Sequence, residues 1–200
     1  SVRMIIANLN FILFNDNLDK KRNNLILITS SIKGEGKTIV STNLASLLSH
    51  KYEKVLLIGA DLRNPQIHKY IGSDKSVKGL SNYIYSDNIN WKDLLIKLDN
   101  LDILLSGTIP PNPTELLSSK KFENFIKEIS SKYDYIIVDS APCLLVSDTF
   151  EISNLFDTTL YVVRANHSDK KLCDFINEIH KNNRLSNMNL VLNSVGNSSE

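Results

Sequence analysis

The sequence predicts an α/β fold in which helices cover both faces of a mostly parallel central sheet, as in a three-layer αβα sandwich. Three observations support this prediction. Apolar runs rich in β-branched residues recur along the chain, helical patterns separate most of them, and several runs are apolar almost throughout. Strands that alternate with helices form crossover units, and parallel strands buried on both faces show no polar alternation.

The predicted elements follow one another without an internal repeat or a linker. The expected strands occupy residues 25–29, 55–58, 101–105, 135–138, 159–163 and 190–192. The clearest helical patterns occupy residues 38–50, 120–131 and 170–182, and a further helix is expected at residues 1–16. Trp91 is expected to pack a short amphipathic helix. Together the elements indicate one domain over residues 1–200.

Two segments between these elements are expected to be irregular. Residues 64–90 contain only short apolar patterns, around 67–71 and 80–84. Residues 106–113 contain three prolines, which prevent a regular element. Long loops after strand ends in such folds often carry function.

Composition and charge narrow the class of protein. The chain is 42% hydrophobic and 22% charged, which is typical of a globular domain, and its net charge of +1 gives no argument for a nucleic-acid partner. Cys143 and Cys173 match no metal-binding spacing, which indicates a reducing, cytosolic compartment. No apolar run approaches the roughly 20 residues that cross a bilayer. Because the chain begins at Ser1 rather than Met, we expect it to be a piece of a longer protein.

The strongest motif is SSIKGEGKT at residues 30–38, between a predicted strand and a predicted helix. This is the context required by the phosphate-binding motif G-x-x-x-x-G-K-[ST]. Glycines let the backbone curl so that successive N–H groups point at phosphate oxygens, and the helix N-terminus adds partial positive charge. One position departs from the motif, because Ser31 replaces the first glycine. The alternative interpretation is a glycine-rich turn that caps the helix.

The loop and the first helical turn are therefore expected to bind ATP, in a P-loop NTPase fold. Lys37 would place its ammonium between the β- and γ-phosphates, and the Thr38 hydroxyl would ligate Mg²⁺. The expected nucleotide contacts in this segment are Ser31, Lys33, Gly34, Glu35, Gly36, Lys37, Thr38 and Ile39.

A phosphate loop also needs an acidic residue at the end of a neighbouring strand to position Mg²⁺. Asp61 and Asp139 both follow predicted strands, at the sheet edge where such folds bind ligands. We therefore predict that both hold the metal and contribute to catalysis with Lys37. The alternative for each is a cap of a helix or loop. Arg63 could reach a phosphate or a carboxylate, or could be a solvated loop residue.

Seven motifs, in order, resemble the cytoplasmic kinase domain of the bacterial tyrosine kinases (BY-kinases) of capsular and exopolysaccharide export. SSIKGEGKT resembles their Walker A loop, VLLIGADLRNP their second acidic motif, and YDYIIVDSAPCLLVSD their Walker B strand. LLSGTIPPNPTELLSS is the most family-specific segment, a proline-rich loop that runs into a helix. The remaining three are GLSNYI, DTTLYVVRANHS and LVLNSVG.

The resemblance implies transfer of the γ-phosphoryl group of ATP to protein tyrosine, with Lys37, Asp61 and Asp139 in the catalytic site. It places Asn193 near the adenine base, although an amide at a strand end is also a common turn former. It implies a tyrosine-containing protein substrate and a membrane adaptor or fused chain-length-determinant domain as partner. It also implies a cytoplasmic location at the inner face of the cell membrane and homo-oligomers formed through the helix at residues 1–16.

Three departures limit the resemblance. Gly59 stands where the family has the first of two aspartates, the natural acceptor of the tyrosine proton. The seven tyrosines are scattered, without a terminal cluster. The N-terminal segment keeps Arg3 but has Ile6 where a second arginine is usual.

Two alternatives therefore remain. A cell-division or partitioning ATPase would share the fold, but its signature lysine is replaced by Ile32, with Lys33 one place away. A catalytically weakened ATP-binding regulator of polysaccharide chain length is favoured by Gly59.

Overall fold

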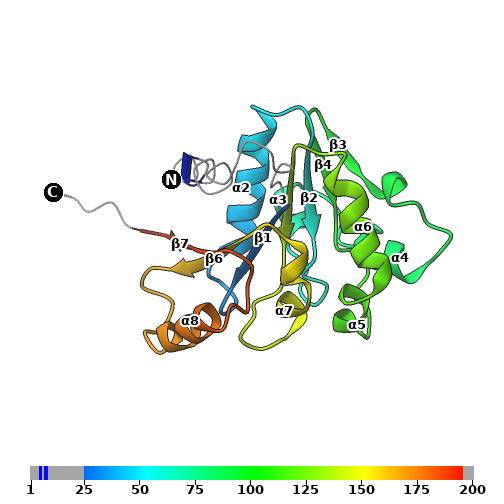
Figure 1. Cartoon of the computed structure of the whole chain (residues 1–200). Helices are drawn as coiled ribbons and strands as arrows, with labels where there is room; N and C mark the ends of the chain where they lie inside the picture. Colours follow the sequence, from blue (N-terminus) through cyan, green and yellow to red (C-terminus); the bar gives the residue numbers. More distant parts are fainter. Residues whose placement is uncertain (1–4, 6, 9–24, 196–200) are drawn as a thin grey trace.

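The structure, a computed structural model, describes residues 5, 7–8 and 25–195 (Figure 1). Its centre is a seven-stranded sheet with the order β3-β4-β2-β5-β1-β6-β7. The strands are β1 (Leu25–Ser30), β2 (Val55–Gly59), β3 (Ile96–Leu98), β4 (Leu101–Leu104), β5 (Tyr135–Asp139), β6 (Thr158–Arg164) and β7 (Met188–Asn193). All neighbours are parallel except β3 and β4. The predicted mostly parallel α/β sheet is confirmed.

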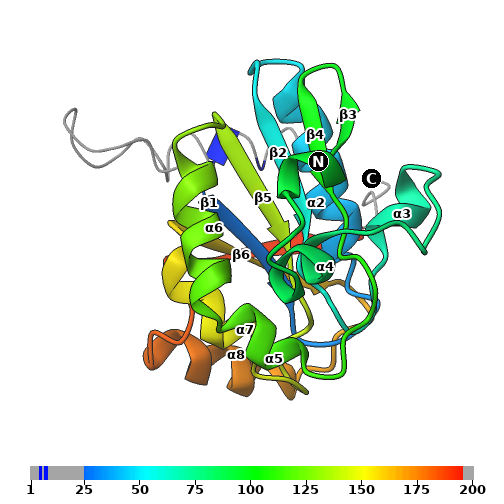
Figure 2. The same ribbon diagram turned by 90° about the vertical axis from the view of Figure 1, so that its right-hand side faces the viewer.

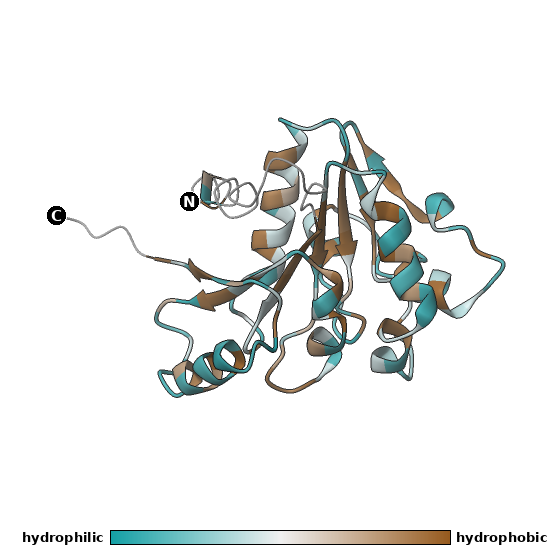
Figure 3. Ribbon diagram, in the orientation of Figure 1, coloured by the Kyte–Doolittle hydropathy of each residue, from teal (hydrophilic) through white to brown (hydrophobic). Residues whose placement is uncertain are grey.

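The central strands are apolar because both of their faces are covered. Every residue of β1, β2 and β5 is buried. Figure 3 shows these strands as an apolar layer, with hydrophilic residues prominent on α6 and α8. Removing this much apolar surface from water is the main favourable contribution to folding.

Helices form a layer on each face of the sheet (Figures 1 and 2). One face packs against α2 (Lys37–Ser49) and α3 (Ile67–Tyr70). The other packs against α4 (Leu80–Tyr85), α5 (Pro113–Leu117), α6 (Lys120–Ser130) and α7 (Asp148–Ile152), with the 3₁₀ helices η1 (Trp91–Leu94) and η2 (Ser153–Leu155). A third apolar cluster joins α8 (Leu172–Lys181) to β6. In the part of the chain that the structure describes, no helix combines the length and hydropathy of a membrane span.

The predicted N-terminal helix lies mostly outside the described residues. Ile5, Ala7 and Asn8 are helical, and Ile5 packs against the apolar cluster under α2. Arg3 and Ile6 are outside the described residues. Oligomerisation through this segment therefore stays a prediction.

The short amphipathic helix predicted around Trp91 is only partly correct. The 3₁₀ helix η1 ends at Leu94, and the following apolar residues form β3, which pairs antiparallel with β4. Asp99 adopts a φ of 43° in the connection between these strands, so a tight reversal replaces a longer helix. Trp91 is buried, and its ring packs edge-on against the ring of Phe125, with the two ring centroids 5.6 Å apart.

The GLSNYI segment binds the loop after β4 through its backbone. Leu80 N donates to Leu105 O at 2.8 Å, and Ser81 N donates to Ser106 O at 2.9 Å. A Cβ at Gly79 would lie 2.0 Å from Leu105 O, so no side chain fits between the two segments. This contact holds the start of the proline-rich segment against α4.

We predict that Gly79→Ala lowers the free energy of unfolding by about 1–3 kcal/mol, because the added methyl group must displace backbone. Urea denaturation measures this loss. Gly72→Ala is the control for a glycine with open space, since a Cβ added at Gly72 would meet nothing within 4 Å, although its φ of 65° adds local strain. A loss for Gly79→Ala no larger than that of the control would contradict the close approach.

Candidate nucleotide-binding site

The phosphate loop joins β1 to α2 at the carboxyl edge of the sheet. Gly34 and Gly36 have φ values of 87° and 95°, in the left-handed region that favours glycine. Gly36 is the N-cap residue of α2, and no side chain of the described residues caps the helix. The first N–H groups of the helix are therefore available to an anion, as phosphate binding requires.

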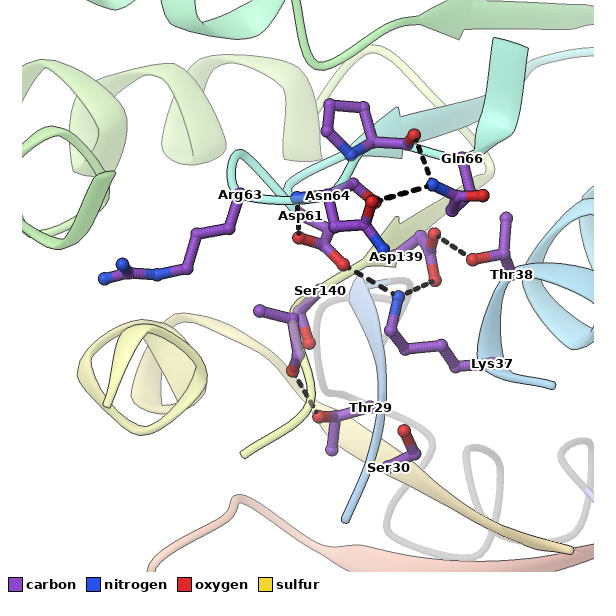
Figure 4. Close-up of polar contacts among 12 residues, drawn as sticks. Thr29, Ser30, Lys37, Thr38, Asp61, Arg63, Asn64, Gln66, Asp139 and Ser140 are labelled. Carbon is purple, nitrogen blue, oxygen red and sulfur yellow. Dashed lines mark hydrogen bonds and ion pairs between the residues drawn. The ribbon is translucent and has the colours of Figure 1, made fainter. Parts of the chain in front are cut away.

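Four predicted side chains meet directly beyond this loop (Figure 4). Lys37 Nζ donates to Asp61 Oδ2 at 3.0 Å and lies 3.8 Å from Asp139 Oδ1. Thr38 Oγ1 donates to Asp139 Oδ2 at 2.8 Å. They converge because β1, β2 and β5 are adjacent parallel strands that end at the same edge, with Gly59 in register with Asp139.

Asp139 is short of partners for a buried carboxylate. Its Oδ1 has no hydrogen-bond partner in the described part of the chain. Burial raises the pKa of Asp139, against the opposing effects of Lys37 and Thr38. The pKa of Lys37 is itself raised, because Asp139 and Asp61 outweigh the effect of its burial. Lys37 is therefore an ammonium ion, and Asp139 Oδ1, which is ion-paired with Lys37 but accepts no hydrogen bond among the described residues, fits a hard cation such as Mg²⁺.

Asp61 is held more completely than Asp139. Its Oδ2 accepts from Lys37, and its Oδ1 accepts from the backbone N of Asn64 at 2.9 Å. Among the described residues, no group of three or more His, Cys, Asp or Glu side chains could hold a metal alone. That is the usual situation for Mg²⁺, which binds through one or two carboxylates together with substrate phosphates.

A cavity of about 220 Å³ opens onto this cluster. Seven residues named from the sequence line it: Lys33, Gly34, Gly36, Lys37, Thr38, Ile39 and Asp61. Sequence reasoning missed four others: Asn64, Gln66, Tyr70 and Pro142. The first three belong to the segment after β2 that was expected to be irregular. Its position directly after a strand end could have indicated that it contributes to the site.

Arg63 is directed away from Lys37 and Thr38 (Figure 4). Its Nε donates to Asp148 Oδ2 at 2.7 Å and its Nη2 donates to Asp148 Oδ1 at 3.0 Å, while Thr114 Oγ1 donates to the same Oδ1 at 2.6 Å. A contact between Arg63 and phosphate stays a prediction, and this structure gives the guanidinium a carboxylate partner instead.

Ser31 and Asn193 have roles that the sequence did not indicate. Ser31 does not adopt a positive φ, so serine is tolerated at the motif's first glycine position, and its buried Oγ lies 2.9 Å from Tyr161 Oη. Asn193 Nδ2 donates to Glu35 O at 3.0 Å. Both side chains contact protein groups around the loop, and neither lines the cavity. The expected adenine contact of Asn193 is untested.

Cys143 is a packing residue next to the phosphate loop's strand. It is buried beside Tyr161, with its Sγ 3.4 Å from Tyr161 Oη. Burial raises the pKa of this thiol to about 11, so it is protonated at neutral pH and unsuited to act as a nucleophile.

The loop, the lysine and the two strand-end carboxylates define a P-loop nucleotide-binding protein. The AAA domain family model matches residues 23–192. The chain is 34% identical over 180 residues to tyrosine-protein kinase CpsD of Streptococcus agalactiae, covering 89% of this chain and 77% of that protein. The chain belongs to the AAA-domain family and, within it, to the bacterial tyrosine-protein kinases.

Two further comparisons agree. The structure matches the kinase domain of Escherichia coli tyrosine kinase ETK with a TM-score of 0.82 and 26% identity, covering all of this chain and 78% of that one. Tyrosine-protein kinase ptk of Acinetobacter johnsonii is 36% identical over 148 residues, which are 74% of this chain and 20% of that protein. The chain thus spans most of some relatives and about a fifth of others.

Proposed function

We propose that this domain binds ATP with Mg²⁺ and transfers the γ-phosphoryl group to the hydroxyl of protein tyrosine. The observation that carries the proposal is the convergence of Lys37, Thr38, Asp61 and Asp139 beyond an uncapped helix N-terminus. The relatives named as tyrosine-protein kinases support this reaction over the partitioning-ATPase alternative.

Each side chain has a defined task in that reaction. Lys37 neutralises charge on the β- and γ-phosphates. To do so, its ammonium must either break its hydrogen bond to Asp61 or contact Asp61 and the phosphates at the same time. Thr38 and Asp139, with Asp61 directly or through water, would hold Mg²⁺, which supplies charge stabilisation at the phosphates. The tyrosine oxygen forms the new P–O bond, ADP leaves with the electron pair of the broken bond, and the tyrosine proton passes to a base or to water. Such transfer depends mainly on positioning and charge stabilisation.

Membership of the same family supports our proposal for the biological setting. The domain would lie at the cytoplasmic face of the cell membrane, beside an adaptor or fused chain-length-determinant domain, and would regulate capsular or exopolysaccharide synthesis. Homo-oligomers and a tyrosine-containing protein substrate belong to the same proposal.

A direct assay tests the reaction. The protein is incubated with ATP, Mg²⁺ and a tyrosine-containing polymer, phosphotyrosine is quantified by mass spectrometry, and ADP binding is measured in parallel. The expected result is phosphotyrosine that depends on both ATP and Mg²⁺. Nucleotide binding without phosphotyrosine would instead support an ATP-binding regulator.

One observation favours that regulator as a second candidate. Gly59 offers no carboxylate at the end of β2, and a Cβ added there would lie 2.5 Å from Ser106 Oγ and 3.0 Å from Ser106 N. Ser106 therefore occupies the space that a side chain at position 59 would need. In this chain a proton acceptor cannot be restored by a single substitution without moving Ser106.

We predict that Gly59→Asp alone lowers the free energy of unfolding by about 1–3 kcal/mol through this overlap. Combined with Ser106→Gly it should fold and raise phosphotransfer, toward the roughly 10²–10⁴-fold that a general base contributes. Phosphotyrosine formation by the double variant is compared with Ser106→Gly alone. A folded double variant without any gain would mean that the site uses another base or none.

A further inference from the structure

Glu35 is an unexpected residue in a loop that must attract phosphate. A carboxylate beside a polyanion is repulsive, so a direct role toward phosphate is unfavourable. Glu35 is fully buried and is not among the residues that line the cavity. Its Oε2 accepts from the backbone N of Ile32 at 2.8 Å, and its Oε1 accepts from Ser168 Oγ. The carboxylate therefore joins the start of the phosphate loop to the loop after β6.

Residues at the ends of β6 and β7 also form hydrogen bonds to the backbone of the phosphate loop. The Arg164 guanidinium donates to Gly34 O at 3.1 Å, and Asn193 Nδ2 donates to Glu35 O at 3.0 Å. Backbone hydrogen bonds tie the residues that carry these donors to their neighbours. Arg164 N donates to Ser168 Oγ at 3.1 Å, and Ala165 N, next to Arg164, donates to Asn193 O at 3.0 Å. All of these groups come from the ends of β6 and β7 and the loop that follows β6.

These contacts fix the direction of the loop's N–H groups. In a trans peptide unit the carbonyl oxygen and the following N–H point in opposite directions. A bond that holds Gly34 O therefore directs Glu35 N–H to the other side of the loop, and a bond that holds Glu35 O does the same for Gly36 N–H. Successive N–H groups on one side form the concave anion site of such loops.

We propose that Glu35, Arg164, Ser168 and Asn193 form a clamp that presets the phosphate loop, with Glu35 as a positioning residue and not a ligand of nucleotide or metal. The proposal rests on the proposed function only in that the loop binds a nucleoside polyphosphate. Without the clamp, the loop populates other conformations. The apparent Kd then rises as the competent fraction falls, while the saturated complex is unchanged.

The first test separates hydrogen bonding by Glu35 from its charge. Glu35→Ala removes both acceptors and is expected to weaken ADP binding about tenfold, since a net hydrogen bond is worth roughly half to one power of ten. Glu35→Gln keeps an acceptor for Ile32 N and offers an amide donor to Ser168 Oγ, so its Kd should stay within about threefold of the parent. Glu178→Ala, at an exposed position on α8, is the matched control. A loss in Glu35→Gln equal to that in Glu35→Ala, or none in either, overturns the proposal.

The second test uses a milder change and remains informative should Glu35→Ala fail to fold. Ser168→Ala breaks the link to Glu35, whereas Ser168→Thr keeps the hydroxyl. For Ser168→Ala we expect KM for ATP to rise about threefold or more while kcat stays within about twofold, with Ser168→Thr close to the parent. A lower kcat at unchanged KM would indicate general loss of folded protein and would overturn the positioning role. ADP binding needs no tyrosine acceptor, so it still tests the clamp in the absence of phosphotransfer.

Discussion

Lys37→Met is expected to abolish phosphotransfer, with a fall in turnover of at least about 10²–10³-fold. The Lys37 ammonium is buried between Asp61 and Asp139, and in the proposed reaction it would neutralise charge that develops between the phosphates. Losing one preorganised electrostatic partner of a reacting oxygen typically costs that much. Methionine has a length close to that of the aliphatic part of the lysine side chain, but it carries no charge. Phosphotyrosine formation and ATP hydrolysis measure the effect.

Folding must be checked separately, because the substitution leaves two buried carboxylates without their cation. Such a loss can destabilise a protein by roughly 3–5 kcal/mol. Circular dichroism and thermal unfolding identify a variant that has not folded. Lys181→Met, at the exposed end of α8, removes a lysine that does not line the cavity and should retain full turnover. Unchanged turnover in folded Lys37→Met would refute the assignment of the phosphate loop.

Asp139→Asn is expected to weaken nucleotide binding about 10–100-fold in the presence of Mg²⁺ and to change it little in EDTA. The substitution preserves shape but replaces a carboxylate, whose Oδ1 accepts no hydrogen bond from the described residues, by a neutral amide group, which is a poor ligand for a hard cation. Loss of a metal-site contact commonly costs one to two powers of ten in affinity. Calorimetric titration with ADP, with and without Mg²⁺, gives both constants.

The role of Asp139 is tested by comparing its loss of ADP affinity with Mg²⁺ and its loss in EDTA. Asp93→Asn, an exposed carboxylate in η1, is the matched control and should bind ADP normally in both buffers. Equal losses with and without Mg²⁺ would show that Asp139 supports the loop and has no role toward the metal.

Much of the candidate site was predictable because it is built from local rules. Glycine spacing predicted the curled loop, and the strand-to-helix context predicted that Lys37 and Thr38 begin a helix. Parallel strands end at a common edge, so Asp61 and Asp139 could be expected near the loop before their distances were known. The long central strands were predictable for the same reason, since burial on both faces leaves an uninterrupted apolar run.

The remaining features depend on contacts between distant positions. Ser31 meets Tyr161, Glu35 meets Ser168 and Arg63 meets Asp148 across more than 80 residues of sequence. A side-chain hydrogen bond leaves no periodic pattern, so only its partners' coordinates reveal it. β3 was missed because three residues are too short for a pattern, and its pairing with β4 decides its structure.

The pairing of Arg63 with Asp148 has a consequence for building hybrids of this enzyme family. One carboxylate receives the guanidinium from the segment after β2 and the hydroxyl of Thr114 from α5, so three segments that are far apart in the sequence meet at a single point. A recombinant chain that takes some of Arg63, Thr114 and Asp148 from one parent and the rest from another loses these hydrogen bonds unless both parents have the same three residues. Gene-shuffling boundaries are therefore best placed outside positions 63–148, with that block exchanged whole.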